Sequence, residues 1–242
     1  MKEKRSVIVS LGGHKGGIGK TSFSNLLALY LKEKTDYSFV VVDADDKQNS
    51  IFSRRKYELK KDPELDEKEL YEMRVYPSAT AGKMIIKNEM GLYDFIIVDF
   101  PGNLNDDGIK KAYNLVDVLF IPINPISFLE AQSIMKFCNT VVKVIDPLRT
   151  KNGFEEADRY FIFNKVNRSV KEFRTNENVE QLRSETPFPV LDGYLPSWKY
   201  FETDFQTLDY FDLGDEKKQT LVESVIEEMV QKIVAVSKKL NK

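Results

Sequence analysis

The residues best suited to chemistry form a glycine-rich run near the start of the chain, Gly12-Gly13-His14-Lys15-Gly16-Gly17-Ile18-Gly19-Lys20-Thr21. Glycines let the backbone curl so that several N–H groups face one concavity, and a helix that begins directly after the run adds its positive end. Lys20 is then placed to reach the β- and γ-phosphates of a nucleotide, and the Thr21 hydroxyl to join the oxygen shell of Mg²⁺. The run therefore predicts a site for a nucleotide and magnesium.

Three carboxylates follow apolar runs further along the chain. Asp43 and Asp45 come directly after Val40-Val41-Val42, and their i, i+2 spacing puts both on the same side of a strand. Asp99 comes directly after Phe95-Ile96-Ile97-Val98. Because parallel strands end at one edge of a sheet, we expect all three acids beside the glycine-rich run. Phosphoryl transfer to water needs positioning and charge neutralisation, and no covalent nucleophile. A helix-capping role for Asp43 and Asp45 is the alternative.

The strands and helices that must hold these residues can be predicted from apolar and amphipathic patterns that alternate along the sequence. Short apolar runs predict buried parallel strands at Val7 to Leu11, Phe39 to Val42, Phe95 to Val98, Val118 to Ile121 and Tyr160 to Phe163. Amphipathic patterns predict helices at Lys20 to Lys32, Ile126 to Val144 and Asp215 to Leu240. The charged stretch Arg54 to Glu72 reads as an exposed helix and loop. Together they predict an α/β fold, with a mostly parallel sheet and helices on both faces.

Composition limits the class of protein. The 242 residues, 42% of them hydrophobic, suffice for one domain spanning 1–242. With 36 Lys+Arg against 38 Asp+Glu, no general attraction to nucleic acid or anionic membranes is expected, and such contacts need a local patch. Cys138 is the only cysteine, so we expect it to be buried and without a disulfide. No apolar run approaches the ~18 residues of a membrane span, and no signal peptide is evident, which predicts a cytoplasmic protein without stable membrane insertion.

The segment Lys15 to Thr21 also fits K-G-G-x-G-K-[ST], the deviant Walker A motif, whereas His14 stands where the strict Walker A pattern has glycine. The chain thus resembles the ParA/MinD family of ATPases, which are P-loop NTPases of the SIMIBI type. The resemblance implies ATP and Mg²⁺ as cofactors and slow ATP hydrolysis. It also implies an ATP-dependent homodimer in which Lys15 reaches the phosphates of the partner's nucleotide.

The same resemblance assigns roles to single residues. The catalytic set would be Lys15, Lys20 and Asp45, with Asp45 orienting or deprotonating the attacking water. The magnesium set would be Thr21, Asp43 and Asp99. The nucleotide-binding set would be Gly16, Gly17, Ile18, Gly19, Lys20, Thr21, Ser22, Asn164 and Pro196, with Asn164 reading the adenine edge. The family pattern D-x-D-P-Q is matched only in part, because proline is absent after Asp45 and Gln48 comes one residue late.

Several branches of this family are distinguished by what the chain contains. One cysteine excludes the branches that hold an iron–sulfur cluster. A MinD-like membrane-positioning ATPase and a CobQ- or dethiobiotin-synthetase-like metabolic enzyme stay open as alternatives. The favoured reading is a ParA-like dimer that binds DNA non-specifically, positions a plasmid, chromosome or other cargo at the nucleoid, and is reset with a ParB-like stimulating partner. No N-terminal helix-turn-helix is expected before Val7. The candidate DNA patch comprises Lys165, Arg168, Lys171 and Arg174, with Arg183 and Lys199 as additions.

Overall fold

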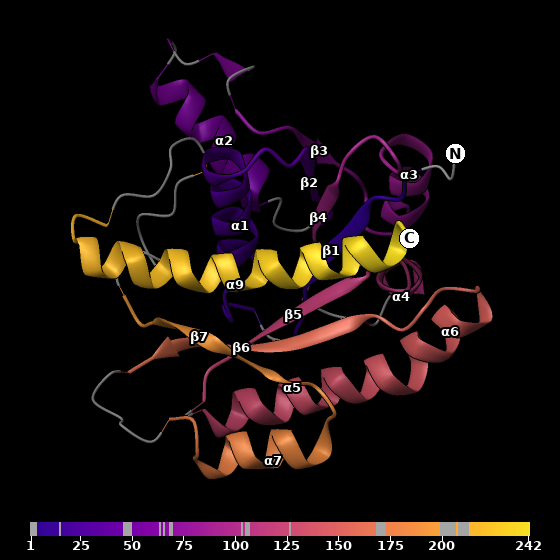
Figure 1. Cartoon of the computed structure of the whole chain (residues 1–242), viewed down its shortest axis with the longest axis vertical. Coiled ribbons are helices and arrows are strands. Elements are labelled where there is room, and N and C mark those ends of the chain that lie inside the picture. The colour runs from indigo at the N-terminus through magenta and orange to yellow at the C-terminus, as the bar shows by residue number, and fades with distance from the viewer. Residues whose placement is uncertain are drawn as a thin grey trace.

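A computed structural model of the protein describes residues 4–14, 16–45, 50–62, 64, 66–67, 70–102, 104, 107–125, 127–167, 173–198, 207 and 213–242. Within them, seven strands form one sheet in the order β3-β2-β4-β1-β5-β6-β7, and every neighbouring pair is parallel (Figure 1). The strands are β1 (Val7–Leu11), β2 (Phe39–Asp43), β3 (Met73–Val75), β4 (Phe95–Asp99), β5 (Val118–Ile123), β6 (Asp158–Val166) and β7 (Val190–Pro196). The fold class is therefore the expected one.

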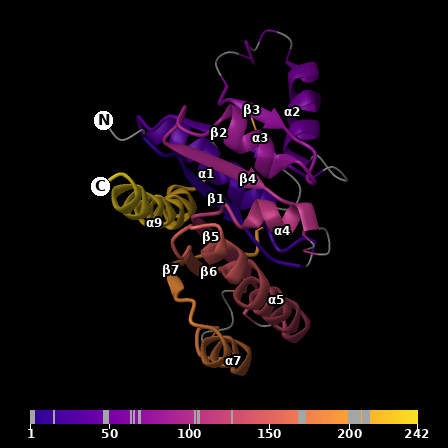
Figure 2. The same ribbon diagram turned by 90° about the vertical axis from the view of Figure 1, so that its right-hand side faces the viewer.

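Helices cover both faces of the sheet. They are α1 (Lys20–Lys34), α2 (Ser50–Lys61), α3 (Ala81–Asn88), α4 (Asp107–Tyr113), α5 (Phe128–Thr140), the π-helix η2 (Val141–Ile145), α6 (Asp146–Lys151), α7 (Glu177–Glu185) and α9 (Glu216–Leu240). Apolar residues of α1 and α9 form one core cluster with the sheet, and those of α3, α4, α5 and α7 form the other. Figure 2 shows α9 on one side of the strands and α4 and α5 on the other.

The long helix α9 confirms the apolar stripe expected near the end of the sequence. Asp215 begins it by accepting hydrogen bonds from the backbone N–H groups of Lys217 at 2.9 Å and Lys218 at 3.2 Å. On its sheet side it buries Val222, Val225, Ile226, Met229, Val230, Ile233 and Val236. Glu228 accepts the N–H groups of Asp192 at 3.0 Å and Gly193 at 2.9 Å, which fastens α9 to β7. No helix in the described part of the chain is long and apolar enough to cross a membrane.

Two expectations from the sequence need correction. The helix expected over Ile126 to Val144 begins as α5 at Phe128 and changes to π-helical geometry at Val141. The charged stretch is not wholly solvated, because Arg55 is only 3% exposed. Its guanidinium donates to the carbonyl of Tyr71 at 2.8 Å and stacks 3.9 Å from the Tyr71 ring centroid. Cys138 is buried and unpaired as expected, and burial raises the pKa of its thiol to about 12.

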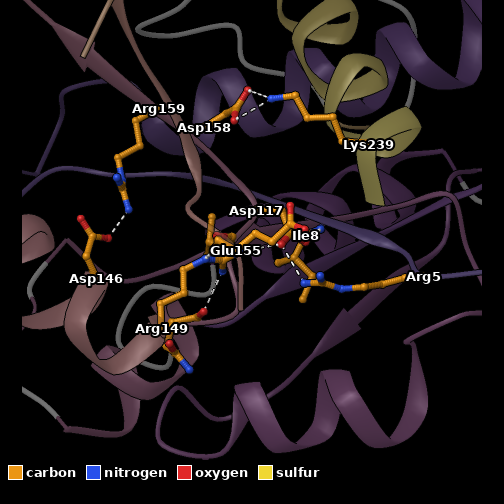
Figure 3. Close-up of polar contacts among 11 residues, drawn as sticks. Arg5, Ile8, Asp117, Asp146, Arg149, Glu155, Asp158, Arg159 and Lys239 are labelled. Carbon is orange, nitrogen blue, oxygen red and sulfur yellow. Dashed lines mark hydrogen bonds and ion pairs between the residues drawn. The ribbon is translucent and has the colours of Figure 1, made fainter. Parts of the chain in front are cut away.

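A buried polar cluster joins the amino ends of β1 and β5 to α6 (Figure 3). The carboxylate of Asp117 accepts from Arg5 at 2.7 Å, from Arg149 at 2.8 Å and from the backbone N–H of Ile8 at 3.0 Å. Arg149 also donates to the carbonyls of Asn114 and Val116, both at 2.8 Å. Every charge in this cluster is thus paired, as burial requires. It holds the sheet at the end opposite the glycine-rich run.

Candidate nucleotide site

The glycine-rich run connects the central strand β1 to α1. β1 lies between β4 and β5, where the strand order reverses direction, which is the usual place for a ligand in such a sheet. Gly17 and Gly19 have φ of 76° and 99°, a left-handed conformation that side chains rarely adopt. A Cβ atom on Gly19 would lie 2.3 Å from Nδ2 of Asn164, so this position has no room for a side chain.

The side chains of Thr21 and Asp99 contact each other next to the loop. The Thr21 hydroxyl donates to Oδ2 of Asp99 at 2.8 Å, whereas the buried Oδ1 of Asp99 has no hydrogen-bond partner among the described residues. Burial raises the pKa of Asp99 to about 7, although the Thr21 hydrogen bond and the Lys20 charge act in the opposite direction. This carboxylate is therefore held in a place where its charge is poorly compensated.

Asp43 lies opposite Asp99 in the register of β2 and β4 and is completely buried. Its oxygens accept from the backbone N–H groups of Asp45 at 3.3 Å and Phe52 at 3.2 Å, so Asp43 anchors the first turn of α2. Burial raises the pKa of Asp43, and these backbone hydrogen bonds partly offset the effect. Asp45 follows two residues later and is half-buried. Asp43 therefore does cap a helix, which is the alternative role expected from the sequence.

Lys20 points its ammonium group toward the loop that follows β4. A Cβ atom on Gly102 would lie 2.9 Å from Nζ of Lys20, so the ammonium group occupies the space that a side chain at this position would need. Burial lowers the pKa of Lys20, and the charges of Asp99 and Asp45 oppose this shift. His14 packs edge-on against Phe137, with ring centroids 5.5 Å apart. Burial, followed by the charges of Lys136 and Lys20, lowers the pKa of His14 and favours its neutral form.

A cavity of about 650 Å³ opens at the carboxyl ends of β6 and β7, next to the loop. It is lined by Asn124, Ser127, Lys165, Val166, Asn167, Pro196, Ser197 and Trp198. Pro196, which we expect to bind the nucleotide, is among them. Asn164 is not, because its amide donates to the carbonyl of Ile18 at 2.7 Å and joins β6 to the phosphate loop. Sequence reasoning missed Trp198, although the only tryptophan of the chain comes two residues after Pro196.

Of the other expected site residues, some lie in the described part of the chain and some lie outside it. Gly16 and Ser22 lie in the loop and the first turn of α1, with open space around Gly16. Lys15 lies outside the described residues, as do Gln48, Arg168, Lys171 and Lys199 of the sequence predictions.

The described members of the basic patch are engaged within the fold. The guanidinium of Arg174 donates to the carbonyl of Asp192 and lies 5.2 Å from the Phe173 ring centroid. Arg183 pairs with Glu180 at 2.8 Å, and Lys165 lines the cavity. Arg183 also donates to the carbonyl of Arg174 at 3.2 Å, so these two residues are neighbours, but each guanidinium is engaged within the fold.

The oxygen atoms at the loop suit magnesium better than a metal held by protein alone. No three His, Cys, Asp or Glu side chains converge on a metal position in the described ranges. Mg²⁺ keeps several waters and takes one or two protein oxygens together with phosphate oxygens. The Thr21 hydroxyl and the unpartnered Oδ1 of Asp99 supply oxygens of this kind.

Comparison with known protein families shows which family the chain belongs to. The profile described as the CobQ/CobB/MinD/ParA nucleotide binding domain matches residues 9–203, which include the loop, Asp43, Asp99 and Pro196. The chain belongs to this nucleotide-binding family. The CobQ/CobB/MinD/ParA domain thus covers β1 from Val9 and all of β2 to β7, and the resemblance expected from Lys15 to Thr21 is confirmed. No curated protein sequence matches the chain.

Solved structures of several members of the CobQ/CobB/MinD/ParA family share the fold. The MinC:MinD cell division complex of Aquifex aeolicus is 15% identical, with a TM-score of 0.64, covering 93% of this chain and 96% of that one. Cobyrinic acid a,c-diamide synthase of Mycobacterium smegmatis, with bound ADP and magnesium, is 15% identical, with a TM-score of 0.63 and coverages of 93% and 94%. pNOB8 ParA bound to nonspecific DNA is 16% identical, with a TM-score of 0.54 and coverages of 98% and 100%.

Proposed function

We propose that the protein is a ParA-like ATPase that binds Mg·ATP, closes into a homodimer and is reset by slow ATP hydrolysis. The observation that carries the proposal is the loop between β1 and α1, where Thr21 bonds Asp99 at 2.8 Å and the Lys20 ammonium is buried nearby. A buried, poorly compensated set of one lysine and several carboxylates is suited to a ligand that brings both phosphate and a divalent cation.

The roles of the residues follow from these positions. Lys20 would pair with the β- and γ-phosphates, whose negative charge stabilises the buried ammonium group. Thr21 and Asp99, with Asp43 behind them, would hold the magnesium ion, which when bound neutralises charge on the phosphates. Asp45 would orient the attacking water, and Lys15 would act on the partner's nucleotide. Gly16, Gly17, Ile18, Gly19 and Ser22 would surround the phosphates with backbone and hydroxyl donors.

Calorimetry with Mg·ATP tests nucleotide binding. The wild-type protein should release heat on binding, and Lys20→Ala should not. Lys32→Ala is the matched control, because Lys32 is an exposed residue of the same helix, about 18 Å along α1. Equal binding by Lys20→Ala and the wild type would exclude the proposed site.

Dimer formation is tested by light scattering after size exclusion. With ATP, an Asp45→Ala variant that cannot hydrolyse it should accumulate as a dimer, and adding Lys15→Ala should return it to a monomer. A monomer under both conditions contradicts the switch. If the mass does not change but ATP turnover requires a small carboxylate substrate, the protein is instead a metabolic ATP-using enzyme.

DNA is the proposed partner of the ATP-bound dimer, with a ParB-like protein as the proposed stimulating partner. The support is the fold shared with a ParA bound to nonspecific DNA, together with Arg168, Lys171 and Lys199. Fluorescence anisotropy with arbitrary duplex DNA should show ATP-dependent binding that weakens steeply with salt. Arg168→Ala with Lys171→Ala should weaken it, whereas Arg183→Ala, which removes a guanidinium paired with Glu180, should not. DNA binding that does not depend on ATP, or that does not weaken with salt, contradicts this part of the proposal.

A further inference from the structure

Trp198 forms an aromatic wall of the cavity at the ends of β6 and β7. The cavity adjoins the phosphate loop, because Asn164, which bonds the carbonyl of Ile18 at 2.7 Å, directly precedes the lining residue Lys165. A nucleotide with its phosphates in the loop therefore has this cavity within reach for its base. The volume of about 650 Å³ is ample for a purine nucleoside.

The backbone next to Trp198 is shaped to open this space. The pairing of β6 with β7 shifts register between Phe163 and Val166, which sit opposite Tyr194 and Pro196, so β6 carries one extra residue there. Within that bulge, Lys165 has a φ of 53°, a left-handed conformation unusual for a side-chain-bearing residue. Bulges of this kind redirect side chains and occur beside functional sites. Here the bulge turns Lys165 toward the cavity.

The indole is held in place by contacts within the fold. Trp198 packs against the core cluster that contains the apolar stripe of α9, and Nζ of Lys218 lies 5.7 Å from the centroid of its ring. A ring fixed in this way loses little conformational freedom when a second ring stacks on it. Asn124 and Asn167 line the same cavity, so polar residues lie beside the ring.

We propose that Trp198 is the stacking wall for the nucleotide base and selects purine over pyrimidine nucleotides. This inference rests on the proposed function, since it places the base of the same nucleotide. A purine covers more of the indole than a pyrimidine does, and stacking on an aromatic side chain is a substantial part of base affinity. Phosphate affinity, by contrast, should not depend on Trp198.

The test uses the intrinsic fluorescence of the intact protein, because Trp198 is its only tryptophan. ATP should quench or shift the emission and protect the indole from acrylamide, whereas tripolyphosphate should bind the loop and leave both unchanged. CTP should bind more weakly than ATP and protect less. No variant is needed for this measurement, so folding defects cannot obscure it.

Variants then measure the contribution of the ring. By calorimetry, Trp198→Ala should weaken ATP binding about ten-fold, equivalent to about 1.4 kcal/mol, and leave tripolyphosphate binding unchanged. Trp198→Phe should stay within about three-fold of the wild type, because it keeps an aromatic face. Tyr57→Ala, at a half-exposed ring on α2, is the control for removal of an aromatic side chain.

The outcomes separate the two proposals. If ATP binds by calorimetry but the tryptophan emission and its protection do not respond, or Trp198→Ala binds ATP as tightly as the wild type, the stacking role is wrong and the ATPase proposal stands. If ATP gives no heat of binding at all, both proposals fail.

Discussion

At the carboxyl end of β4, Asp99 is only 2% exposed, and its charge is compensated in part by the Thr21 hydroxyl and the Lys20 ammonium group. Its pKa of about 7 lies above the value of about 4 expected in the unfolded chain. The folded protein therefore binds this proton more tightly than the unfolded chain does. The stabilisation is fully present below about pH 4 and is lost as the pH rises through about 7.

Asp99→Asn should for this reason stabilise the nucleotide-free, magnesium-free protein at about pH 8, by up to about 4 kcal/mol for a pKa difference of about three, and much less at about pH 4. Urea unfolding at both pH values measures the difference. The exposed Asp36→Asn is the control and should show no such dependence. The same Asp99→Asn substitution should weaken magnesium-dependent ATP binding. A stability gain that does not change with pH would rule out the buried charge as its cause.

Gly16 and Gly19 offer a matched pair within one loop. Gly19→Ala places a Cβ atom 2.3 Å from the Asn164 amide at a φ of 99°, whereas Gly16 has nothing within 4 Å. We expect Gly19→Ala to lower the free energy of unfolding by about 2 kcal/mol, through backbone strain and loss of the bond from Asn164 to Ile18. Gly16→Ala should change it by less than about 0.5 kcal/mol. Chemical denaturation of the nucleotide-free variants tests the pair, and equal losses would contradict the geometry.

Among the elements, α6 depends on one arginine. Arg149 is 3% exposed and joins the carbonyls of Asn114 and Val116 to the carboxylate of Asp117. Arg149→Met should destabilise the protein by about 3 kcal/mol or more, because it leaves buried acceptors without a donor. Lys151→Met, at an exposed position of the same helix, should have little effect. Thermal and urea unfolding compare the two variants, and similar stabilities would show that the cluster in Figure 3 contributes little.

The elements also show where sequence reasoning succeeds. Strands β2 and β4 are apolar runs that end in an aspartate, so their positions and the acids at their ends could be predicted. β3 has three residues with Arg74 at its centre, and β7 contains Asp192-Gly193, which reads as a turn. Both strands exist because of their parallel pairing with β2 and β6, which is a tertiary contact.

The same limit applies within the candidate site. Motif spacing predicted the loop and the carboxylates, which lie close together in sequence or at strand ends. The bond from Asn164 to Ile18 and the place of Trp198 in the cavity depend on how β6 and β7 approach the loop. No local pattern in the chain encodes that approach.

For the whole molecule, ATP binding should be coupled to global stability. A ligand that binds only the folded state stabilises it by about 2.7 kcal/mol at 100 times its Kd. Differential scanning fluorimetry should therefore show a rise in Tm with Mg·ATP for the wild type and for Lys32→Ala, and none for Lys20→Ala. A rise in Tm for Lys20→Ala would mean that ATP stabilises the protein from a site other than the loop.

The two hydrogen bonds that Glu228 accepts from Asp192 and Gly193 have a consequence for solubility. β7 is the last strand of the described sheet, and Asp192 and Gly193 lie where its pairing with β6 is irregular, so their N–H groups would otherwise be donors to which a foreign strand could bond. The carboxylate occupies two of these donors and places negative charge beside them. A single side chain of α9 thus removes two backbone donors of this edge strand from pairing with a second molecule.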